Sequence, residues 1–344
     1  MDQGPAVNDL AEFMGRNLAL EAVRVTEATA LAASRLVGCG DERELEQAAT
    51  RAMFTALNGL QIEGSIILGE GPEEEIATLY NGQRVGEGGG PAIDVALDAI
   101  EGTTICAKGG SNVISVLAMA GKGGLLHVPP VYMEKIAVGP GLPEDVVNLD
   151  ASPAENLKNL ALAKGVAVSD LLICMLDRPR HDELMNRVRE AGARIMLIGD
   201  GDVSGVVAAT QPLSGVDLYI GTGGAPEGVL AAAALACVGG QMQGRLLLRS
   251  ESDKQAARAL GIEDFRRIYG VRDLALGEVV FAATGVSDGP LLRGVRRYRG
   301  GAVSHSLVMR SHTGTLRYIE AHHNSQRKAG LDSLGRDEQA GRSE

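Results

Sequence analysis

The chain has 344 residues, of which 45% are apolar and 22% are charged, a composition that suits one large or two medium globular domains. Its net charge of −11 argues against a nucleic-acid partner, because binding a phosphate backbone requires a basic surface. An anionic small molecule remains possible as a ligand if arginines or bound cations offset the acidic charge locally.

The first half of the chain predicts helices packed on a sheet. Apolar residues recur at helical spacing from Asn8 to Gly38, and Asp41 can cap a second helix that runs to Asn58. The stretch 84–91 is rich in glycine and predicts a turn. Short apolar runs predict five strands, at 64–69, 92–97, 113–119, 125–128 and 136–138. Residues 1–150 are therefore expected to form an α+β domain.

After residue 150, short apolar runs alternate with amphipathic segments, a pattern typical of βαβ units and a parallel sheet. The expected strands are 171–176, 195–198 and 216–220, and the expected helices are 181–190, 203–209 and 226–237. Residues 151–322 should thus form a second α/β domain, with a cleft between the two domains. The polar tail 323–344 is expected to be disordered.

The cysteines at positions 39, 106, 174 and 237 stand alone in the sequence, and none belongs to a CxxC pair. This usage predicts reduced thiols in a cytoplasmic protein rather than disulfides or a zinc site. The N-terminus has no apolar signal segment, and the apolar run 228–244 is too short to span a membrane. We therefore expect no membrane partner.

Acidic residues lie at the ends of several predicted elements. Glu70 follows the strand 64–69, Asp98 and Glu101 follow the strand 92–97, and Glu227 begins a helix. Carboxylates presented in this way suit Mg²⁺ or Mn²⁺, which take oxygen ligands. Two such ions can activate a water and stabilise the leaving oxygen of a phosphoryl group.

The spacing of Asp98 and Glu101 has two interpretations. One helical turn would place both carboxylates on one side, next to Gly102 and the hydroxyl of Thr103. Alternatively, Asp98 caps a helix and Glu101 is its capping-box partner. Spacing alone leaves both interpretations open.

The stretch Asp98-Ala-Ile-Glu101-Gly-Thr103 resembles the D-P-I-E-G-T signature of the lithium-sensitive phosphatase superfamily, which includes inositol monophosphatases and fructose-1,6-bisphosphatases. From about residue 17 to 322, the chain is similar to the class II, GlpX-type fructose-1,6-bisphosphatases. Each shared motif is weak alone, but their order and spacing together are a strong indication. The other motifs are Arg24-Val-Thr-Glu27, Gly69-Glu-Gly71, Ala92-Ile-Asp-Val95, Tyr132-Met-Glu-Lys135, Val138-Gly-Pro-Gly141, Arg178-Pro-Arg-His-Asp182, Asp200-Gly-Asp202, Gly223-Gly-Ala-Pro-Glu-Gly228 and Ala283-Thr-Gly285.

This resemblance implies a layered αβαβα sugar-phosphatase fold, hydrolysis of fructose 1,6-bisphosphate to fructose 6-phosphate, and a homodimer or homotetramer. It assigns orientation of the attacking water to Thr103 together with Glu74. The positions that match metal ligands are Glu46, Glu70, Asp98, Glu101 and Glu227. The positions that match substrate contacts are Glu101, Gly102, Thr103, Tyr132, Arg178, Pro179, Arg180, Asp200, Gly201, Asp202 and Gly224.

Several positions around one end of this site depart from the family pattern. Two interpretations follow. Either the metal site is retained and the enzyme acts on another sugar phosphate, or catalysis is weakened and the protein binds a phosphosugar. Sedoheptulose 1,7-bisphosphate and a specialised sugar or nucleoside phosphate are the alternative substrates, and an inositol phosphatase is a third possibility. Acidic character at Glu46 and Glu74 favours an active enzyme. The departures are Glu42 for Lys, Glu46 for Asp, Gln47 for Gly, Pro72 for Glu, Glu74 for Asp and Ala99 for Pro.

Two further features have simpler interpretations. His181 is expected to be structural. The basic run from Leu292 to Arg299 predicts a solvent-exposed strand edge, although it could also serve an anionic partner.

Overall fold

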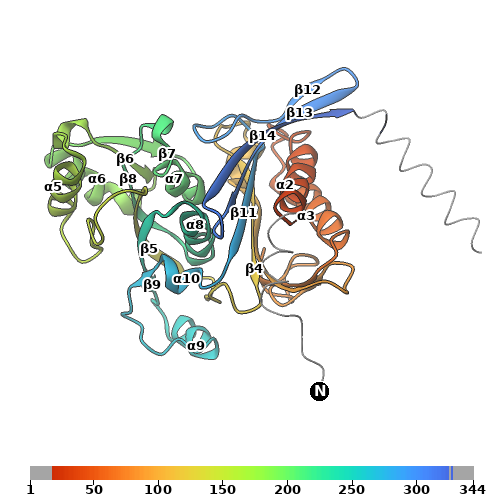
Figure 1. The fold of residues 1–344 in the computed structure, drawn as a ribbon, viewed down its shortest axis with the longest axis horizontal. Helices are drawn as coiled ribbons and strands as arrows, with labels where there is room; N and C mark the ends of the chain where they lie inside the picture. Colours follow the sequence, from red (N-terminus) through yellow and green to blue (C-terminus); the bar gives the residue numbers. More distant parts are fainter. Residues whose placement is uncertain (1–17, 325–326, 328–344) are drawn as a thin grey trace, which may run out of the picture.

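The computed structural model describes residues 18–324 and residue 327 of the chain. Two β-sheets alternate with three layers of helices (Figure 1). One apolar cluster lies between the outer helices and the first sheet, and a second surrounds the central helices. A third lies between the second sheet and the helices α5 (Pro153–Lys164) and α6 (Asp182–Glu190). The predicted α/β class and its αβαβα layering are therefore confirmed.

The first sheet has eight strands and takes them from both ends of the chain. Its order is β12-β13-β11-β4-β3-β1-β2, with β14 beside β13. Only β1 and β3 pair in parallel, and the other pairs are antiparallel. The strands are β1 (Glu63–Leu68), β2 (Arg84–Val85), β3 (Ala92–Glu101), β4 (Ile114–Gly121), β11 (Val279–Gly285), β12 (Arg296–Tyr298), β13 (Gly301–Arg310) and β14 (Thr315–Asn324).

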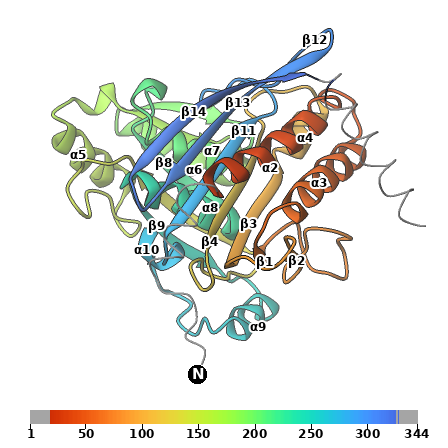
Figure 2. The ribbon, with the colours of Figure 1, turned by 45° about the vertical axis from the view of Figure 1, so that its right-hand side comes forward.

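Helices α2 (Leu18–Ala33) and α3 (Glu42–Asn58) cover the outer face of this sheet (Figure 2). The predicted cap of α3 is confirmed, because the Asp41 carboxylate accepts from the Glu44 N–H at 3.0 Å. Helix α2 ends five residues before Gly38, where the backbone bonds shorten to i−3 spacing and Ser34 bonds back to Leu31. The predicted start of this helix, at residues 8–17, lies outside the described residues.

The central layer contains α7 (Asp202–Ala208), α8 (Ala225–Val238) and the short α10 (Val271–Leu274). Helix α8 is almost wholly apolar and buried, because it packs against both sheets. It has Pro226 in its first turn and ends at Gly239, which adopts a left-handed conformation. This central helix carries Glu227 into the space between the sheets.

The second sheet has the order β10-β9-β5-β8-β6-β7. Strands β7, β6 and β8 are parallel, as the alternating pattern predicts, whereas β5 is antiparallel to both neighbours. The remaining elements are β5 (Tyr132–Val138), β6 (Leu172–Leu176), β7 (Arg194–Ile198), β8 (Leu218–Gly224), β9 (Gln241–Leu247), β10 (Tyr269–Gly270), α4 (Thr103–Ala107), α5 (Pro153–Lys164), α6 (Asp182–Glu190), α9 (Glu251–Ala259), η1 (Val168–Asp170), η2 (Pro179–His181) and η3 (Pro212–Ser214).

Three local predictions are corrected. The expected strand 125–128 is absent, and Leu125 forms only an isolated bridge, since two prolines follow at 129 and 130. The expected turn 84–91 begins with strand β2. The expected disordered tail does not start at His323, which completes β14 and bonds Ser304 at 2.7 Å. Residues 325–326 and 328–344 lie outside the described residues.

Sheet membership crosses the expected boundary at residue 150. Strand β5 precedes that boundary but belongs to the second sheet, and β11 to β14 follow it but belong to the first. The division into 1–150 and 151–322 stays a prediction.

The basic run from Leu292 to Arg299 contains strand β12, whose three residues are exposed, as expected for a strand edge. No described helix has the length and apolar character needed to cross a membrane.

Candidate active site

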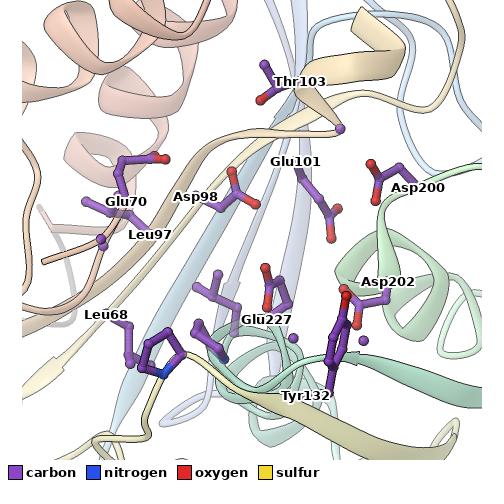
Figure 3. A pocket seen from close by; sticks show the side chains of 18 of the residues that line it. Leu68, Glu70, Leu97, Asp98, Glu101, Thr103, Tyr132, Asp200, Asp202 and Glu227 are labelled. Atoms are coloured by element: carbon purple, nitrogen blue, oxygen red, sulfur yellow. The ribbon is translucent and has the colours of Figure 1, made fainter. Parts of the chain in front are cut away.

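A cavity of about 780 Å³ lies between the two sheets, where β1 and β3 end and β5 begins. Figure 3 shows carboxylates from the first sheet and from α8 facing into this space, with Tyr132 at the far side from Thr103. The predicted residues in its wall are Glu70, Asp98, Glu101, Gly102, Thr103, Tyr132, Arg178, Arg180, Asp200, Asp202, Gly224 and Glu227.

A break in the strand pairing, rather than a helix, brings Asp98 and Glu101 to the same cavity. Both belong to β3, and the register with β4 shifts between them. Strand residues three apart normally face opposite sides, but a bulge adds a residue and turns the second side chain round. The predictions of a helical turn and of a capping box are therefore both wrong.

The bulge also frees backbone N–H groups for the carboxylates. The Ala99 N–H donates to Glu70 Oε1 at 2.8 Å, which fixes Glu70 at the end of β1. The superfamily signature has proline at this position, and proline has no N–H to donate. Ala99 is thus a departure with a structural consequence, because it gives Glu70 a partner that the signature lacks.

Glu101 crosses the space between the sheets and caps a helix of the central layer. Its two oxygens accept from the N–H groups of Val203 at 2.6 Å and Ser204 at 3.2 Å, at the start of α7. The positive end of the helix favours a carboxylate there. Burial nevertheless raises the pKa of Glu101, and repulsion from Asp202 raises it further.

Two glycines of β8, in the second sheet, make room for acidic side chains of the central helices. A Cβ at Gly224 would lie 1.9 Å from Glu227 Oε2, and a Cβ at Gly223 would lie 2.0 Å from Asp202 Oδ2. Glu227 Oε2 is buried and has no hydrogen-bond partner among the described residues. An unsatisfied buried carboxylate oxygen is costly unless a cation or proton meets it.

Lys135 lies beneath this group and was not predicted as a site residue. Its fully buried Nζ forms an ion pair with Asp202 and donates to the Gly224 carbonyl at 2.7 Å. Only its place in the motif Tyr132-Met-Glu-Lys135, as a lysine directly before the apolar run 136–138, could have pointed to it. A buried lysine almost always has a specific partner.

The charge balance of the cavity fits a bound cation. Burial raises the pKa of Asp98, and repulsion from Glu70, Glu101 and Glu227 raises it further; burial likewise raises the pKa of Glu227. Among residues 18–324 and 327, no three His, Cys, Asp or Glu side chains are arranged to hold a metal ion as they stand. The donors suit a hard cation in kind, but their side chains must turn toward one another to share one.

The pKa of Glu70 predicts how the stability of the metal-free protein depends on pH. Burial raises this pKa from 4.5 to about 7, the Ala99 hydrogen bond opposes the rise, and repulsion from Glu46 and Glu227 adds to it. The folded protein therefore holds a proton that the unfolded chain has lost. The resulting stabilisation is complete below the unfolded pKa of 4.5 and is lost as the pH rises through about 7.

We accordingly expect the Tm of the protein in chelator to fall between about pH 5 and about pH 8. The fall should be smaller in Glu70→Gln, which cannot ionise. Differential scanning fluorimetry across this range measures both slopes, and equal slopes in the two proteins would contradict the assignment to Glu70.

Four predicted residues do not line the cavity. Glu46 is half-buried on α3 and acts on Glu70 through its charge. Glu74 lies on the exposed turn after Pro72. Pro179 begins η2, and Gly201 separates Asp200 from Asp202 with a left-handed φ of 88° that favours glycine.

The arginine side of the cavity is built on the loop after β6. Arg178 pairs with Asp200 at 3.5 Å, and Arg180 donates from Nε and Nη2 to the Thr222 carbonyl at 3.0 and 2.8 Å.

His181 connects this loop to strand β8 through hydrogen bonds of both ring nitrogens. Its Nδ1 bonds the Leu176 carbonyl, its Nε2 accepts from the Thr222 N–H, and burial lowers its pKa. The expected structural role of His181 is therefore confirmed.

Comparison with known proteins decides the family. Residues 16–323 match the family described as bacterial fructose-1,6-bisphosphatase, glpX-encoded. The chain belongs to this family. The family predicted from the ordered motifs is thus confirmed, and so is the predicted enzyme class, a phosphoric monoester hydrolase.

Named members of the GlpX-type family cover nearly the whole chain. A "D-fructose 1,6-bisphosphatase class 2/sedoheptulose 1,7-bisphosphatase" from Synechococcus sp. is 40% identical over 335 residues, 90% of this chain and 96% of that protein. The "Fructose-1,6-bisphosphatase 1 class 2" of Escherichia coli is 40% identical over 328 residues, 92% of this chain and 97% of that protein. A solved SuhB structure from Bartonella henselae, 12% identical over 56% of this chain and 73% of that chain, has a TM-score of 0.32, too slight a likeness to argue from.

Proposed function

We propose that this protein hydrolyses a sugar bisphosphate, with fructose 1,6-bisphosphate, cleaved at its 1-phosphate, as the leading substrate. The observation that carries this proposal is a cavity lined by buried and half-buried carboxylates and by Arg178 and Arg180. The carboxylates suit a cation and the guanidinium groups suit a phosphate. Relatives that are 40% identical and bear the name fructose-1,6-bisphosphatase support the choice of sugar.

Mg²⁺ or Mn²⁺ is the proposed cofactor, held by Glu70, Asp98, Glu101 and Glu227, with Glu46 behind Glu70. Such an ion, when bound, lowers the pKa of water and offsets the phosphate charge. The carboxylates come from both sides of the cavity, since Glu227 belongs to α8, Asp98 and Glu101 belong to β3, and Glu70 follows β1. Metal binding would thus also fix the two sides relative to each other.

Thr103 is the proposed group that orients the attacking water. Its hydroxyl donates to the Ile100 carbonyl at 3.2 Å, which leaves the oxygen lone pairs free to accept from a water in the cavity. Glu74 remains the proposed partner of Thr103, a role that requires its exposed turn to approach the cavity. Asp202, held by Lys135, can accept from sugar hydroxyls.

Sedoheptulose 1,7-bisphosphate is the second candidate substrate. It is favoured by the double name of the Synechococcus relatives, which pairs the two bisphosphatase activities. A cytoplasmic location and a homodimer or homotetramer remain part of the proposal.

Phosphate release from a panel of sugar phosphates tests this function. We expect release from fructose 1,6-bisphosphate with Mg²⁺ or Mn²⁺, loss of release in EDTA, and recovery when metal is restored. Glu101→Gln should reduce release on the order of 100-fold, because the uncharged amide is a poorer metal ligand. Unchanged release in this variant would remove Glu101 from the site.

The same panel separates the alternatives. Release without any added or endogenous metal would contradict the proposed cofactor. Metal-dependent binding of sugar phosphates without turnover would identify a phosphosugar-binding protein. Preference for an inositol phosphate would point to the third possibility.

A further inference from the structure

Asn112, which was not predicted as a site residue, connects three segments that are far apart in the sequence. It lies between α4, which begins at Thr103, and β4. Its backbone N–H donates to the Asp288 carbonyl at 2.8 Å. Its side-chain Nδ2 donates to the Asp200 carbonyl at 3.2 Å and to Ser204 Oγ at 2.9 Å. One side chain thus joins the segment after Thr103 to the turn that begins with Asp200.

The partners of this side chain determine the orientation of its amide. The Asp200 carbonyl can only accept a hydrogen bond, and the Ser204 hydroxyl already donates its hydrogen to the Gly201 carbonyl at 2.8 Å. Both contacts therefore require the NH2 end of Asn112. Its other polar atom, Oδ1, is buried and has no hydrogen-bond partner among the described residues. Leaving a buried oxygen unsatisfied is costly, so the side chain makes its two donor contacts at the expense of its acceptor.

The backbone around Asn112 is also adapted to these contacts. Its φ of 69° is left-handed, a conformation that asparagine adopts more readily than most residues other than glycine. Gly289 leaves room for the side chain, since a Cβ there would lie 2.8 Å from Asn112 Oδ1. Gly201 leaves room on the other side, where a Cβ would lie 3.1 Å from Nδ2. The turn 200–202 therefore packs closely on the Asn112 amide, which restricts its movement.

The turn that Asn112 holds presents side chains to the cavity. Asp200 and Asp202 both line it, and Figure 3 shows them on the side next to Glu101. Glu101 accepts from two N–H groups at the start of α7 and so fixes that helix. The Asp200 carbonyl lies before the helix and is held by Asn112 instead. Loss of the Asn112 side chain should therefore free Asp200, while Glu101 keeps the helix in place.

We propose that Asn112 is a positioning residue, which holds the turn at Asp200 against the segment that follows Thr103 and so sets where Asp200 meets the substrate. Asn112 itself touches no substrate, because it does not line the cavity. This inference rests on the proposed sugar-bisphosphatase function. It places the effect of Asn112 on substrate binding rather than on hydrolysis, since a group that binds by hydrogen bonds must be held in the productive geometry.

The kinetics of Asn112→Gly test this assignment. Glycine tolerates the left-handed φ, so the substitution removes both side-chain hydrogen bonds without straining the backbone. The KM for fructose 1,6-bisphosphate should rise about 10-fold with kcat little changed, as expected when hydrogen bonds that position a binding group are lost. A merely structural role would lower Tm and leave KM unchanged. An unchanged KM, or a fall in kcat alone, would therefore overturn the proposal.

Asn112→Asp separates positioning from charge. Aspartate has the same shape and also tolerates the left-handed φ, but it cannot donate to the Asp200 carbonyl. Its KM should rise as the KM of Asn112→Gly does. If KM rises in Asn112→Asp alone, the added negative charge is the cause and the proposal fails.

Asn156→Asp is the matched control for general loosening of the protein. Asn156 is another buried asparagine whose Nδ2 donates to a backbone carbonyl, that of Asn148 at 2.9 Å, but neither residue lines the cavity. Its substitution should lower Tm and leave KM unchanged. A rise in KM equal to that of Asn112→Gly would contradict a specific role for Asn112.

A binding measurement keeps the test independent of turnover. In a calorimetric titration, fructose 6-phosphate should bind about 10-fold more weakly to Asn112→Gly than to the unmodified protein. Absence of turnover in the unmodified protein would defeat the proposed function, while this titration would still decide the role of Asn112. Unaltered affinity in the variant, or no affinity in the unmodified protein, contradicts that role.

Discussion

An Asp98→Asn variant is expected to be more stable than the unmodified protein when no metal is present, and to lose nearly all hydrolysis of sugar bisphosphates. Asp98 is half-buried beside Glu70, Glu101 and Glu227, and their repulsion adds to its desolvation in raising its pKa. Asparagine has the same shape and keeps an oxygen that can accept a backbone N–H. The substitution therefore removes a carboxyl group whose ionisation the folded protein opposes, without opening a cavity.

The two effects should differ in sign and size. Removing one of these four crowded carboxyl groups should stabilise the metal-free protein by about 1 kcal/mol, which raises Tm by roughly 1–2 °C in a chain of 344 residues. Hydrolysis should fall on the order of 1,000-fold, which corresponds to about 4 kcal/mol of transition-state stabilisation. Added Mg²⁺ or Mn²⁺ should raise Tm less in the variant than in the unmodified protein.

Thermal unfolding in EDTA and in metal, with phosphate release measured in parallel, checks this prediction. Asp145→Asn is the control, since Asp145 is exposed and its left-handed backbone (φ 55°) also suits asparagine. The control should change neither Tm nor rate. A lower Tm in Asp98→Asn without metal would mean that the carboxylates do not repel one another as the structure indicates.

Ala99 and Glu46 show how sequence departures alter one end of the site. The Ala99 N–H holds Glu70 from one side, and the charge of Glu46 raises the pKa of Glu70 from the other. Another departure, Glu42, accepts a hydrogen bond from Thr104 at 3.0 Å and so ties α3 to the turn that carries Thr103. These substitutions change the surroundings of Glu70 and Thr103 while keeping both residues in the cavity wall.

Sequence patterns predicted most of the helices and the central strands. Helix α3 has an amphipathic pattern and a capping Asp41, and α8 is an apolar run bounded by Pro226 and Gly239. Strands β1, β6 and β7 are short, largely apolar runs. The family motifs placed Asp98, Glu101 and Glu227 in one site. Local signals were enough for these helices and strands because each depends on neighbours in the sequence, whereas the grouping of the three carboxylates came from the family resemblance.

Features that depend on distant contacts could not be predicted. The bulge in β3 arises from its pairing with β4, so the spacing of Asp98 and Glu101 suggested a helix instead. Strands β11 to β14 follow residue 150 in the sequence but pair with the strands of the first sheet. This pairing depends on the topology of the whole chain, which local patterns do not contain. Arg249 meets Tyr132 only through the folded arrangement of β9 beside β5.

Lys135→Met is expected to be the most destabilising of the substitutions considered. The side chain is fully buried, and it pairs with Asp202, which is 5% exposed, while donating to the Gly224 carbonyl. Methionine fills a similar volume but leaves Asp202 as a buried charge without its partner. Breaking a buried pair in this way costs about 3–5 kcal/mol. Activity should fall as well, because Asp202 and Glu227 would face the cavity without this positive charge.

Urea denaturation of Lys135→Met and of the double variant Lys135→Met/Asp202→Asn distinguishes an ion pair from simple packing. If the unpaired charge of Asp202 is the cause, the double variant should recover most of the lost free energy of unfolding but none of the activity. A single variant that loses less than about 1 kcal/mol would show that the pair contributes little. Because Lys135 touches the backbone of Gly224, which makes room for Glu227, recovery of stability without recovery of hydrolysis would indicate that the lysine is needed to position the carboxylates.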